Sequence, residues 1–355
     1  MNTPQALLTH AVIGCGRPIS TEGATGYGMA YAHAIAFAST GRCRLAAACD
    51  IVRANAEAFV ARHQPDAPIF TDAREMLAAI RPDIVSICLW PHLHATMVEL
   101  CAPFRPRAIL CEKPMDVHWD RALSMAQACR EHGVQLSIAH QRRFTMPLQR
   151  ARTLIEEGAI GRLLRMDSAW IDMADCGTHV LDMMFFLNKE TPVEWVLGQI
   201  EPRGSRRLFG AIMLGQAFCE FRFANGVRAT YHGGHQHQER GAMLRVRGET
   251  GELEILFEQP WLRIRRDTQP GWESIDTGET IHDEKAFPRV AADIVDCLDT
   301  GRSPLLSAEH ALRATEIIFA TYASAQRRAR VDLPLPPGPS ALQAMIDGGQ
   351  LTFDV

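Results

Sequence analysis

The sequence predicts two domains: an N-terminal α/β domain with a parallel sheet, and a C-terminal α+β domain with a large, mostly antiparallel open sheet. Up to about residue 140, short apolar segments alternate with helix-like segments, the rhythm of a sheet covered by helices on both faces. Beyond residue 160, strand-like segments follow one another, with the turn signals ANG and ETG between them. We therefore expect domains at residues 1–140 and 141–355.

Each domain has a clear series of expected elements. In the first, the strands are 9–14, 44–50, 68–70, 83–89, 107–112 and 134–140, and the helices are 53–63, 72–80, 94–102 and 119–133, with a further apolar helix-like run after the first glycine turn. In the second, helices are expected at 148–161, 176–188, 285–301 and 307–329, and strands at 193–200, 210–223, 226–234, 242–249, 251–258 and 262–267.

Composition narrows the class of protein. The chain has 355 residues, of which 47% are hydrophobic and 22% charged, and a formal net charge of −4. That length accommodates two cores, and the absence of a basic field argues against nucleic acid or an anionic membrane as partner. We see no export signal or membrane-spanning run. Ten scattered cysteines without a C-x-x-C pair are read as reduced thiols of a cytoplasmic protein.

A glycine-rich loop follows the first expected strand. Gly14 and Gly16 fit the tight turn and the close approach to pyrophosphate in a Rossmann dinucleotide motif, and Ala30 fits its third small position. Residues 17–29 then form an insertion where the motif has two residues. Asp50 lies 20 residues after Ala30, where a ribose-binding acid is expected, which favours NAD over NADP. The alternative is a Gly-rich surface turn with Asp50 capping a helix.

One segment resembles a known family. The run CEKPMDVHWDRALSMAQACREHGVQLSIAHQRRF, from Cys111 to Phe144, is similar to the Gfo/Idh/MocA oxidoreductases, whose Glu-Lys-Pro signature matches Glu112, Lys113 and Pro114. The resemblance continues in DCGTHVLDMMFFL, similar to the family's Asp-x-Gly-x-His-x-x-Asp helix, and in FRFANGVRATY, VRGETGELEI and the segment from Asp293. It therefore covers nearly the whole chain and implies a nicotinamide-dependent oxidoreductase.

The resemblance also implies roles for individual residues. Lys113 would hold and polarise the substrate oxygen beside the nicotinamide, and His179 would be the general base in oxidation or the acid in reduction. Asp175, four residues before His179, would bind a second hydroxyl from the same helix face. Glu112 and His94 are expected on the cofactor side. Taken singly, His179 also fits a core histidine, Asp175 a helix N-cap and Lys113 a surface residue before a turn.

This chain departs from the family pattern at one place. After the fourth strand, Leu89, Trp90 and Pro91 stand where the family has Thr, Pro and Asn, which removes the polar contact that the Asn usually makes on the nicotinamide side.

Other polar residues allow more than one interpretation. Asp182 orients the His179 imidazole or makes an ordinary helix hydrogen bond. Arg142 and Arg143 line the substrate pocket or anchor the domain junction, and we favour the junction. The three nearby histidines are expected in a solvated loop, with substrate contact, subunit contact or metal binding as alternatives; they are His232, His235 and His237. We expect no metal in the reaction.

The leading hypothesis is an NAD(H)-dependent dehydrogenase that acts on a secondary hydroxyl of a sugar, polyol or related carbohydrate derivative. A homodimer or homotetramer is expected to form through the C-terminal sheet. One alternative is an NAD-assisted enzyme that cleaves glycosides through transient sugar oxidation. Another is a non-catalytic nucleotide or sugar sensor, against which Lys113, Asp175 and His179 argue. The insertion at 17–29 is expected to fold over the cofactor, with a plain surface excursion as the alternative.

Overall fold

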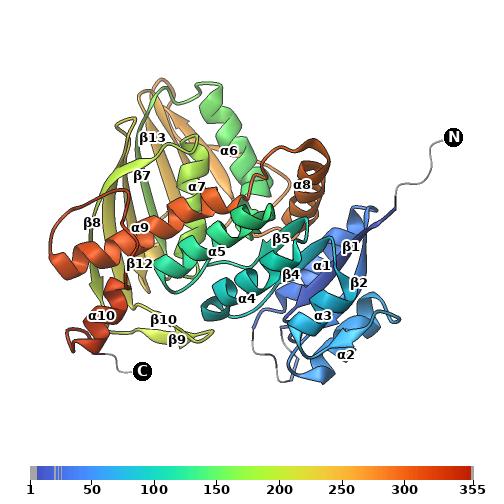
Figure 1. Cartoon of the computed structure of the whole chain (residues 1–355). Helices are drawn as coiled ribbons and strands as arrows, with labels where there is room; N and C mark the ends of the chain where they lie inside the picture. The colour runs from blue at the N-terminus through green and yellow to red at the C-terminus, as the bar shows by residue number, and fades with distance from the viewer. Residues whose placement is uncertain (1–5, 20, 23, 25, 353–355) are drawn as a thin grey trace. The chain divides into compact units, whose positions relative to one another are not determined.

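The computed structural model describes residues 6–19, 21–22, 24 and 26–352 (Figure 1). The chain divides into two compact units: residues 1–117, 121–141 and 284–309 form the first, and residues 118–120, 142–283 and 310–355 form the second. The expected boundary near 140 differs from this division mainly in residues 284–309, which pack with the N-terminal unit. No helix in the described part of the chain combines the length and apolarity needed to cross a membrane.

In its described residues, the first unit contains a six-stranded sheet with the order β3-β2-β1-β4-β5-β6, in which every pairing is parallel. The predicted parallel sheet is thus confirmed. Its strands are β1 (Leu8–Ile13), β2 (Cys43–Cys49), β3 (Ile69–Phe70), β4 (Ile84–Ile87), β5 (Ala108–Cys111) and β6 (Gln135–Ile138). Its helices are α1 (Met29–Ser39), α2 (Arg53–His63), α3 (Ala73–Ile80), α4 (His94–Cys101), α5 (Trp119–His132) and α8 (Ala286–Thr300).

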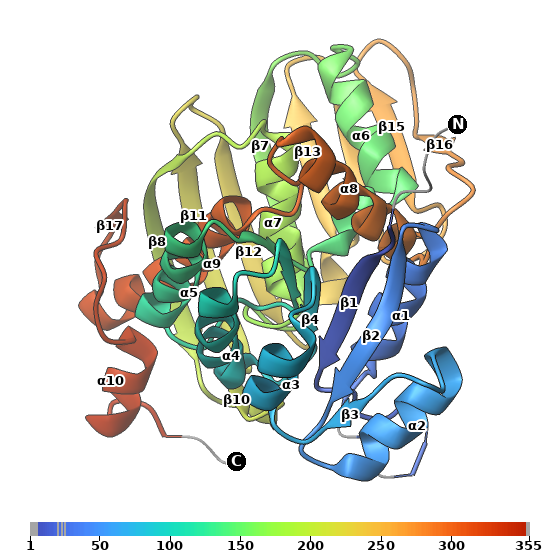
Figure 2. The same ribbon diagram turned by 45° about the vertical axis from the view of Figure 1, so that its right-hand side comes forward.

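Helix α8 comes from far along the chain, yet it packs against α1 beside the parallel sheet (Figure 2). Arg42, just before β2, donates to the carboxylates of Asp296 and Asp299 on α8. Residues just beyond α8 cover the edge of the sheet, because Ile138 N–H in the edge strand β6 donates to the Leu306 carbonyl at 2.9 Å. Segment 284–309 therefore completes this unit.

The described part of the second unit contains a nine-stranded sheet with the order β16-β15-β14-β13-β7-β12-β11-β8-β17. Its pairings are antiparallel except between β7 and β12, so the predicted, mostly antiparallel sheet is confirmed. The strands are β7 (Leu163–Trp170), β8 (Val193–Glu201), β11 (Gln216–Phe223), β12 (Arg228–Gly234), β13 (Leu244–Gly248), β14 (Gly251–Ile255), β15 (Leu262–Arg266), β16 (Glu273–Ile275) and β17 (Val331–Asp332). Strands β9 (Arg206–Leu208) and β10 (Ala211–Met213) form a separate hairpin.

Helices cover one face of this large sheet (Figure 1). They are α6 (Met146–Glu156), α7 (Gly177–Leu187) and α9 (Ala308–Arg327), and the shorter α10 (Ala341–Asp347) follows near the C-terminus. Every residue of α7 is buried, which explains its almost wholly apolar sequence GTHVLDMMFFL. The two titratable side chains of α7, His179 and Asp182, are buried with it. Burying a polar side chain costs free energy unless it is hydrogen-bonded, so His179 and Asp182 are candidate functional residues.

Candidate active site

The turn after β1 requires glycine at two positions for different reasons. Gly14 has φ 85°, and a Cβ there would lie 2.6 Å from the Leu89 side chain and 2.7 Å from the Cys88 carbonyl oxygen. Gly16 has φ 55°, and a Cβ there would meet nothing within 4 Å. Gly14 is therefore held by close packing, whereas the backbone of Gly16 borders open space. This arrangement suits a turn that a phosphate group approaches from outside.

Asp50 follows β2 and lies beside that turn. It is 8% exposed. Its Oδ2 accepts a hydrogen bond of 2.8 Å from the Gly16 N–H, and its Oδ1 accepts one of 2.8 Å from the Val52 N–H. A carboxylate has further lone pairs after these two bonds, so Asp50 can still accept from a ribose hydroxyl. The residues predicted to hold the adenosine side of a dinucleotide, Gly14, Gly16 and Asp50, are thus brought together.

The insertion between Gly16 and α1 folds back on itself. The Arg17 guanidinium donates to the Glu22 carbonyl at 2.6 Å and to the Asn55 side chain at 3.1 Å. Gly28 precedes α1 with φ 66°, and a Cβ there would lie 2.8 Å from the Arg17 carbonyl oxygen. Ala30, in the first turn of α1, is fully buried in the core beside β1 and β2. Residues 20, 23 and 25 of the insertion, including Gly23, lie outside the described residues.

Glu112 and Lys113 follow β5 in the same unit. Glu112 accepts at 3.1 Å from the His33 Nε2, and its second oxygen accepts at 3.3 Å from the Lys113 N–H. Burial by itself would raise the pKa of Glu112, but the hydrogen bond and charge of His33, together with the charge of Lys113, outweigh it and lower the pKa. Glu112 is thereby kept ionised, and it ties the backbone of Lys113 to α1.

The His33 imidazole extends this network into the core. Its Nδ1 lies 3.1 Å from the Ser86 Oγ, and His10 Nε2 lies 2.8 Å from the same oxygen. Burial, with the neighbouring His33, lowers the pKa of His10 to about 3. The sequence reasoning missed this chain of side chains. The signal was present, because His10, His33 and Ser86 are polar residues within apolar strand or helix segments.

His94, expected on the cofactor side, is fully buried. Its Nδ1 lies 2.7 Å from the Pro114 carbonyl oxygen, and its Nε2 lies 3.0 Å from the Leu89 carbonyl oxygen. Burial lowers its pKa, against the opposing effect of the two carbonyls. Since both ring nitrogens face backbone carbonyls, the contribution of His94 to a cofactor site is to join α4 to the turn at Lys113–Pro114.

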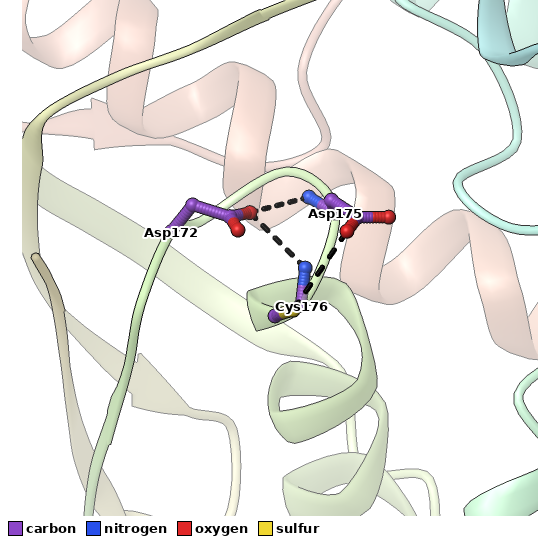
Figure 3. A group of neighbouring side chains, drawn as sticks. All are labelled: Asp172, Asp175 and Cys176. Atoms are coloured by element: carbon purple, nitrogen blue, oxygen red, sulfur yellow. Dashed lines mark hydrogen bonds between the residues drawn. The ribbon is translucent and has the colours of Figure 1, made fainter. Parts of the chain in front are cut away.

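In the second unit, Asp175 and His179 lie at the start of α7 and are 3% and 4% exposed. The expectation that one helix carries both differs from the structure: α7 begins at Gly177, so Asp175 stands in the turn before it. Asp172 shapes this turn, because its Oδ1 accepts from the Asp175 N–H at 2.6 Å and from the Cys176 N–H at 3.0 Å (Figure 3). Asp172 thereby satisfies N–H groups at the helix N-terminus.

Gly177 allows this turn to pack closely. A Cβ on Gly177 would lie 2.4 Å from the Tyr231 hydroxyl oxygen and 2.5 Å from the Asp172 carbonyl oxygen. The Tyr231 hydroxyl itself donates to that carbonyl at 2.5 Å. Gly177, the glycine of the Asp-x-Gly-x-His pattern, therefore leaves room for the hydrogen bond by which Tyr231 on β12 holds the Asp172 backbone.

Asp172, Asp175 and Cys176 also form the group of potential metal ligands found among the described residues, with their ligand atoms within 4.8 Å of one another. The helix-capping hydrogen bonds of Asp172, and the contact of 3.7 Å from the Cys176 Sγ to the Asp175 Oδ2, account for this closeness (Figure 3). We interpret the group as the capped start of α7.

The two consecutive arginines have different surroundings. Arg143 is fully buried, and it donates to both Asp182 oxygens at 2.7 Å and to Glu190 at 2.5 Å. Burial would lower the pKa of Arg143, but these carboxylates raise it. The sequence suggests that Asp182 orients the His179 imidazole. In the structure, Asp182 binds Arg143. Arg142 instead stacks on Trp170, with its guanidinium carbon 4.5 Å from the ring centre.

The three histidines in and after β12 are dispersed. His232 packs against Phe218, the His235 Nε2 lies 3.4 Å from the Gly204 carbonyl, and the His237 Nδ1 lies 3.0 Å from the Gly234 carbonyl. Among the described residues, these histidines are not in any group close enough to share a metal ion. His237 also stacks on Trp170, with ring centres 6.4 Å apart.

Comparison with known proteins agrees with both units. Residues 9–140 match the Gfo/Idh/MocA family model described as "Oxidoreductase family, NAD-binding Rossmann fold". Residues 165–333 match the model described as "Oxidoreductase family, C-terminal alpha/beta domain".

Curated relatives are similar over part of their length. Inositol 2-dehydrogenase of Burkholderia multivorans is 26% identical over 160 residues, 44% of this chain and 47% of the relative. D-glucoside 3-dehydrogenase of Escherichia coli is 28% identical over 133 residues, 37% of each chain. The chain thus spans less than half the length of these two relatives.

Solved structures share the fold at low identity. A levoglucosan dehydrogenase in complex with NADH and levoglucosan has a TM-score of 0.76 at 19% identity and covers 92% of this chain and 100% of its own. An oxidoreductase of Agrobacterium radiobacter, in complex with NAD+, L-tartaric acid and magnesium, has a TM-score of 0.76 at 19% identity, with coverage of 92% and 98%.

Proposed function

Because the chain belongs to the Gfo/Idh/MocA family of oxidoreductases, we propose that it is an NAD(H)-dependent dehydrogenase. It transfers hydride between the nicotinamide and a secondary hydroxyl of a sugar, polyol or related carbohydrate derivative. The observation that carries the proposal is the pair of buried polar groups Asp175 and His179 at the capped start of α7. Inositol and glucoside dehydrogenases among its relatives support the substrate class.

The N-terminal unit is the family's NAD-binding Rossmann domain, and its residues fit that cofactor. Gly14 and Gly16 would hold the pyrophosphate, and Asp50 would accept from the adenosine ribose. The Asp50 carboxylate would also repel a 2′-phosphate, which favours NAD over NADP. Arg53, which could accommodate such a phosphate, is instead paired with Glu57 at 2.9 Å.

The proposed chemistry uses three side chains. NAD, when bound, supplies the hydride acceptor. His179 takes the proton of the reacting hydroxyl, Lys113 stabilises the developing carbonyl oxygen, and Asp175 holds a second hydroxyl to orient the ring. The cap by Asp172 fixes the turn that carries Asp175. Glu112 and His94 hold the backbone from which the Lys113 side chain extends.

The test is a screen of sugars and polyols with NAD, in which the formation of NADH is measured by its absorbance. We expect turnover by the intact protein and a loss of at least about a hundredfold in kcat for Lys113→Ala and for His179→Ala, since removing a general acid or base costs 10²–10⁴-fold. Catalysis unaffected by both changes would refute the site assignment. Glu131→Gln, at an exposed position of α5, is the matched control.

A redox-neutral reaction is the second candidate. One relative, 2,7-anhydro-N-acetylneuraminate hydratase of Escherichia coli, is 34% identical over 82 residues, 23% of this chain and 22% of its own. In this scheme transient oxidation of a sugar assists cleavage of a glycoside. Turnover of a glycoside without net NADH would support it, whereas stoichiometric NADH with a free sugar would exclude it.

The insertion at 17–29 is proposed to fold over the cofactor. The contacts of Arg17 with Glu22 and Asn55 support an ordered start to this loop beside Asp50. Shortening the loop to two residues is expected to raise the Kd for NAD; an unchanged Kd and turnover would assign the loop to a surface excursion.

We also propose a homodimer or homotetramer that forms through the large sheet, and a cytoplasmic location. Leu197 on β8 and Phe218 on β11 are 45% and 37% exposed, and their strand neighbour Gly198 packs against Thr321 of α9. Leu197 and Phe218 therefore belong to the sheet face away from the helices. The location is supported by the cysteines, because no disulfide joins them within the described residues.

A further inference from the structure

Arg142 is a buried cation that forms no salt bridge with a carboxylate among the described residues. It is 8% exposed. Within the described residues, its Nη2 contacts His282 Nδ1 at 3.3 Å, and its Nη1 is buried without a hydrogen-bond partner. Arg143, the next residue, shows the usual solution to burying a guanidinium, with hydrogen bonds to Asp182 and Glu190. Arg142 lacks that solution.

The partners of Arg142 hold it in place without neutralising it. Trp170 supports the guanidinium from the ring face, and His282 lies 5.7 Å from Trp170 between ring centres. Burial, together with the charge of Arg142, lowers the pKa of His282 to about 4, so this ring is a neutral acceptor at pH 7. The Arg142 guanidinium is therefore held in position before a ligand binds, while its Nη1 hydrogens have no acceptor among the described residues.

Arg142 is close to the proposed catalytic turn. Trp170 is the last residue of β7 and stands two residues before the capping Asp172. Burial lowers the pKa of Arg142 to about 10, and the nearby Cys176 and Asp175 partly oppose that effect. A ligand held by Asp175 and His179 would thus lie within reach of a fixed guanidinium.

A second unused donor faces the same group of rings. Trp261 packs against His282, with ring centres 6.1 Å apart, and its Nε1 is buried without a hydrogen-bond partner among the described residues. Two buried donors, on Arg142 and Trp261, therefore flank His282. Leaving buried donors unpaired costs free energy, which a ligand with acceptor oxygens would recover.

We propose that Arg142 binds a carboxylate of the substrate, so that the enzyme oxidises an acidic sugar or polyol, of the uronic or aldonic acid class. This inference rests on the proposed dehydrogenase function and names its substrate class. The planar guanidinium fork matches a carboxylate through two parallel hydrogen bonds, which a single hydroxyl cannot reproduce. A carboxylate also supplies the negative charge that Arg142 lacks.

The test measures equilibrium binding of matched probes to the full chain with saturating NADH, by calorimetry. The pairs are D-glucuronate with D-glucose and D-galacturonate with D-galactose, and D-glucose 6-phosphate represents a different anion. We expect at least one acidic sugar to bind about tenfold or more tighter than its neutral partner, the range of a charge-assisted bidentate contact. Arg142→Gln should abolish that preference, and Arg142→Lys should restore part of it.

Arg263→Gln is the matched control, because Arg263 also stacks on a tryptophan, with its guanidinium carbon 4.4 Å from the Trp272 ring centre, but is paired with Glu254. This variant should keep the preference for the acidic sugar. Equal binding of acidic and neutral sugars by the wild-type protein, tighter binding of the phosphate, or an unchanged preference in Arg142→Gln would each overturn the proposal. Failure of the dehydrogenase proposal itself is seen separately, as absence of NADH production.

Discussion

At the residue scale, Arg142 and Arg143 are neighbours in the sequence with different roles. Arg143 stabilises the fold, whereas Arg142 is proposed to bind the substrate. Arg143 is a fully buried charge with two carboxylate partners, whereas Arg142 is buried and has no salt bridge to a carboxylate in the part of the chain that the structure describes. The RR dipeptide in the sequence cannot distinguish them, because their partners come from α7, the turn after it, and residue 282. The assignment of a buried charge to the fold or to a ligand depends on those tertiary contacts.

This difference predicts effects of different size on stability. Arg143→Met should lower the free energy of unfolding by about 3–5 kcal/mol, because it removes the cation that the buried Asp182 binds and one of the two arginines that bind Glu190. Arg142→Met should stay within about 1 kcal/mol of the wild-type value, since removal of an unbalanced buried charge offsets the lost stacking on Trp170. Urea unfolding followed by circular dichroism measures both. Equal losses in the two variants would contradict this assignment.

His10 predicts a pH dependence of stability. Its folded-state pKa, about 3, lies below the ordinary value of 6.5, so the unfolded chain binds the proton more tightly. The contribution of His10 to stability is therefore complete above pH 6.5 and declines as the pH falls from 6.5 toward 3. The slope for one such group is about 1.4 kcal/mol per pH unit.

Urea midpoints at pH 7 and pH 5 measure this effect. We expect the loss between these two values to be smaller in His10→Asn than in the wild-type protein. The partly exposed His132→Asn on α5 is the control and should show the wild-type loss. An identical loss in wild type and His10→Asn would disprove the role of His10.

At the element scale, the start of α7 depends on Asp172. Asp172→Ala removes the acceptor for the Asp175 and Cys176 N–H groups and should cost about 1–2 kcal/mol of stability. The same change should lower kcat, because the turn that carries Asp175 loses its constraint. Asp172→Asn retains an acceptor oxygen and should recover most of the stability. Thermal melts and steady-state kinetics on the two variants separate the cap from the charge of Asp172.

Sequence periodicity predicted most elements, because the strands of the parallel sheet are buried apolar runs and α3 and α8 have clear helical patterns. It missed β7, the strand at the centre of the large sheet. Leu164 and Arg165 in β7 are exposed, and its polar Asp167 accepts at 2.6 Å from the Thr230 hydroxyl, 63 residues away. Such a strand is defined by its neighbours β12 and β13, so local pattern alone does not reveal it.

The candidate site was predictable to a similar extent. The motif spacing indicated Gly14, Gly16 and Asp50, and the structure brings them together. The spacing of Asp175 and His179 predicted their proximity but not the break before Gly177, which comes from the cap by Asp172 and the contact with Tyr231. The roles assigned to Lys113, Asp175 and His179 remain predictions for the kinetic test.

At the scale of the whole molecule, the exposed apolar residues of the large sheet predict an assembly. The double variant Leu197→Glu, Phe218→Glu places like charges at the centre of the proposed interface and should dissociate the oligomer. Light scattering after size exclusion measures the mass. Arg162→Glu, an exposed position before β7, is the control and should keep the native mass. A wild-type protein that elutes as a monomer would contradict the proposal.

The late position of α8 in the sequence affects how the protein folds during its synthesis on the ribosome. Domains usually fold from the N-terminus as they emerge. Here the Leu306 carbonyl that caps the edge of β6, and the Asp296 and Asp299 carboxylates that bind Arg42, are translated after every described strand of the large sheet except β17. The nascent nucleotide-binding sheet therefore has an open edge while more than 140 further residues are added, and an unpaired strand edge is where chains aggregate. Its completion must wait for a segment made near the end of synthesis.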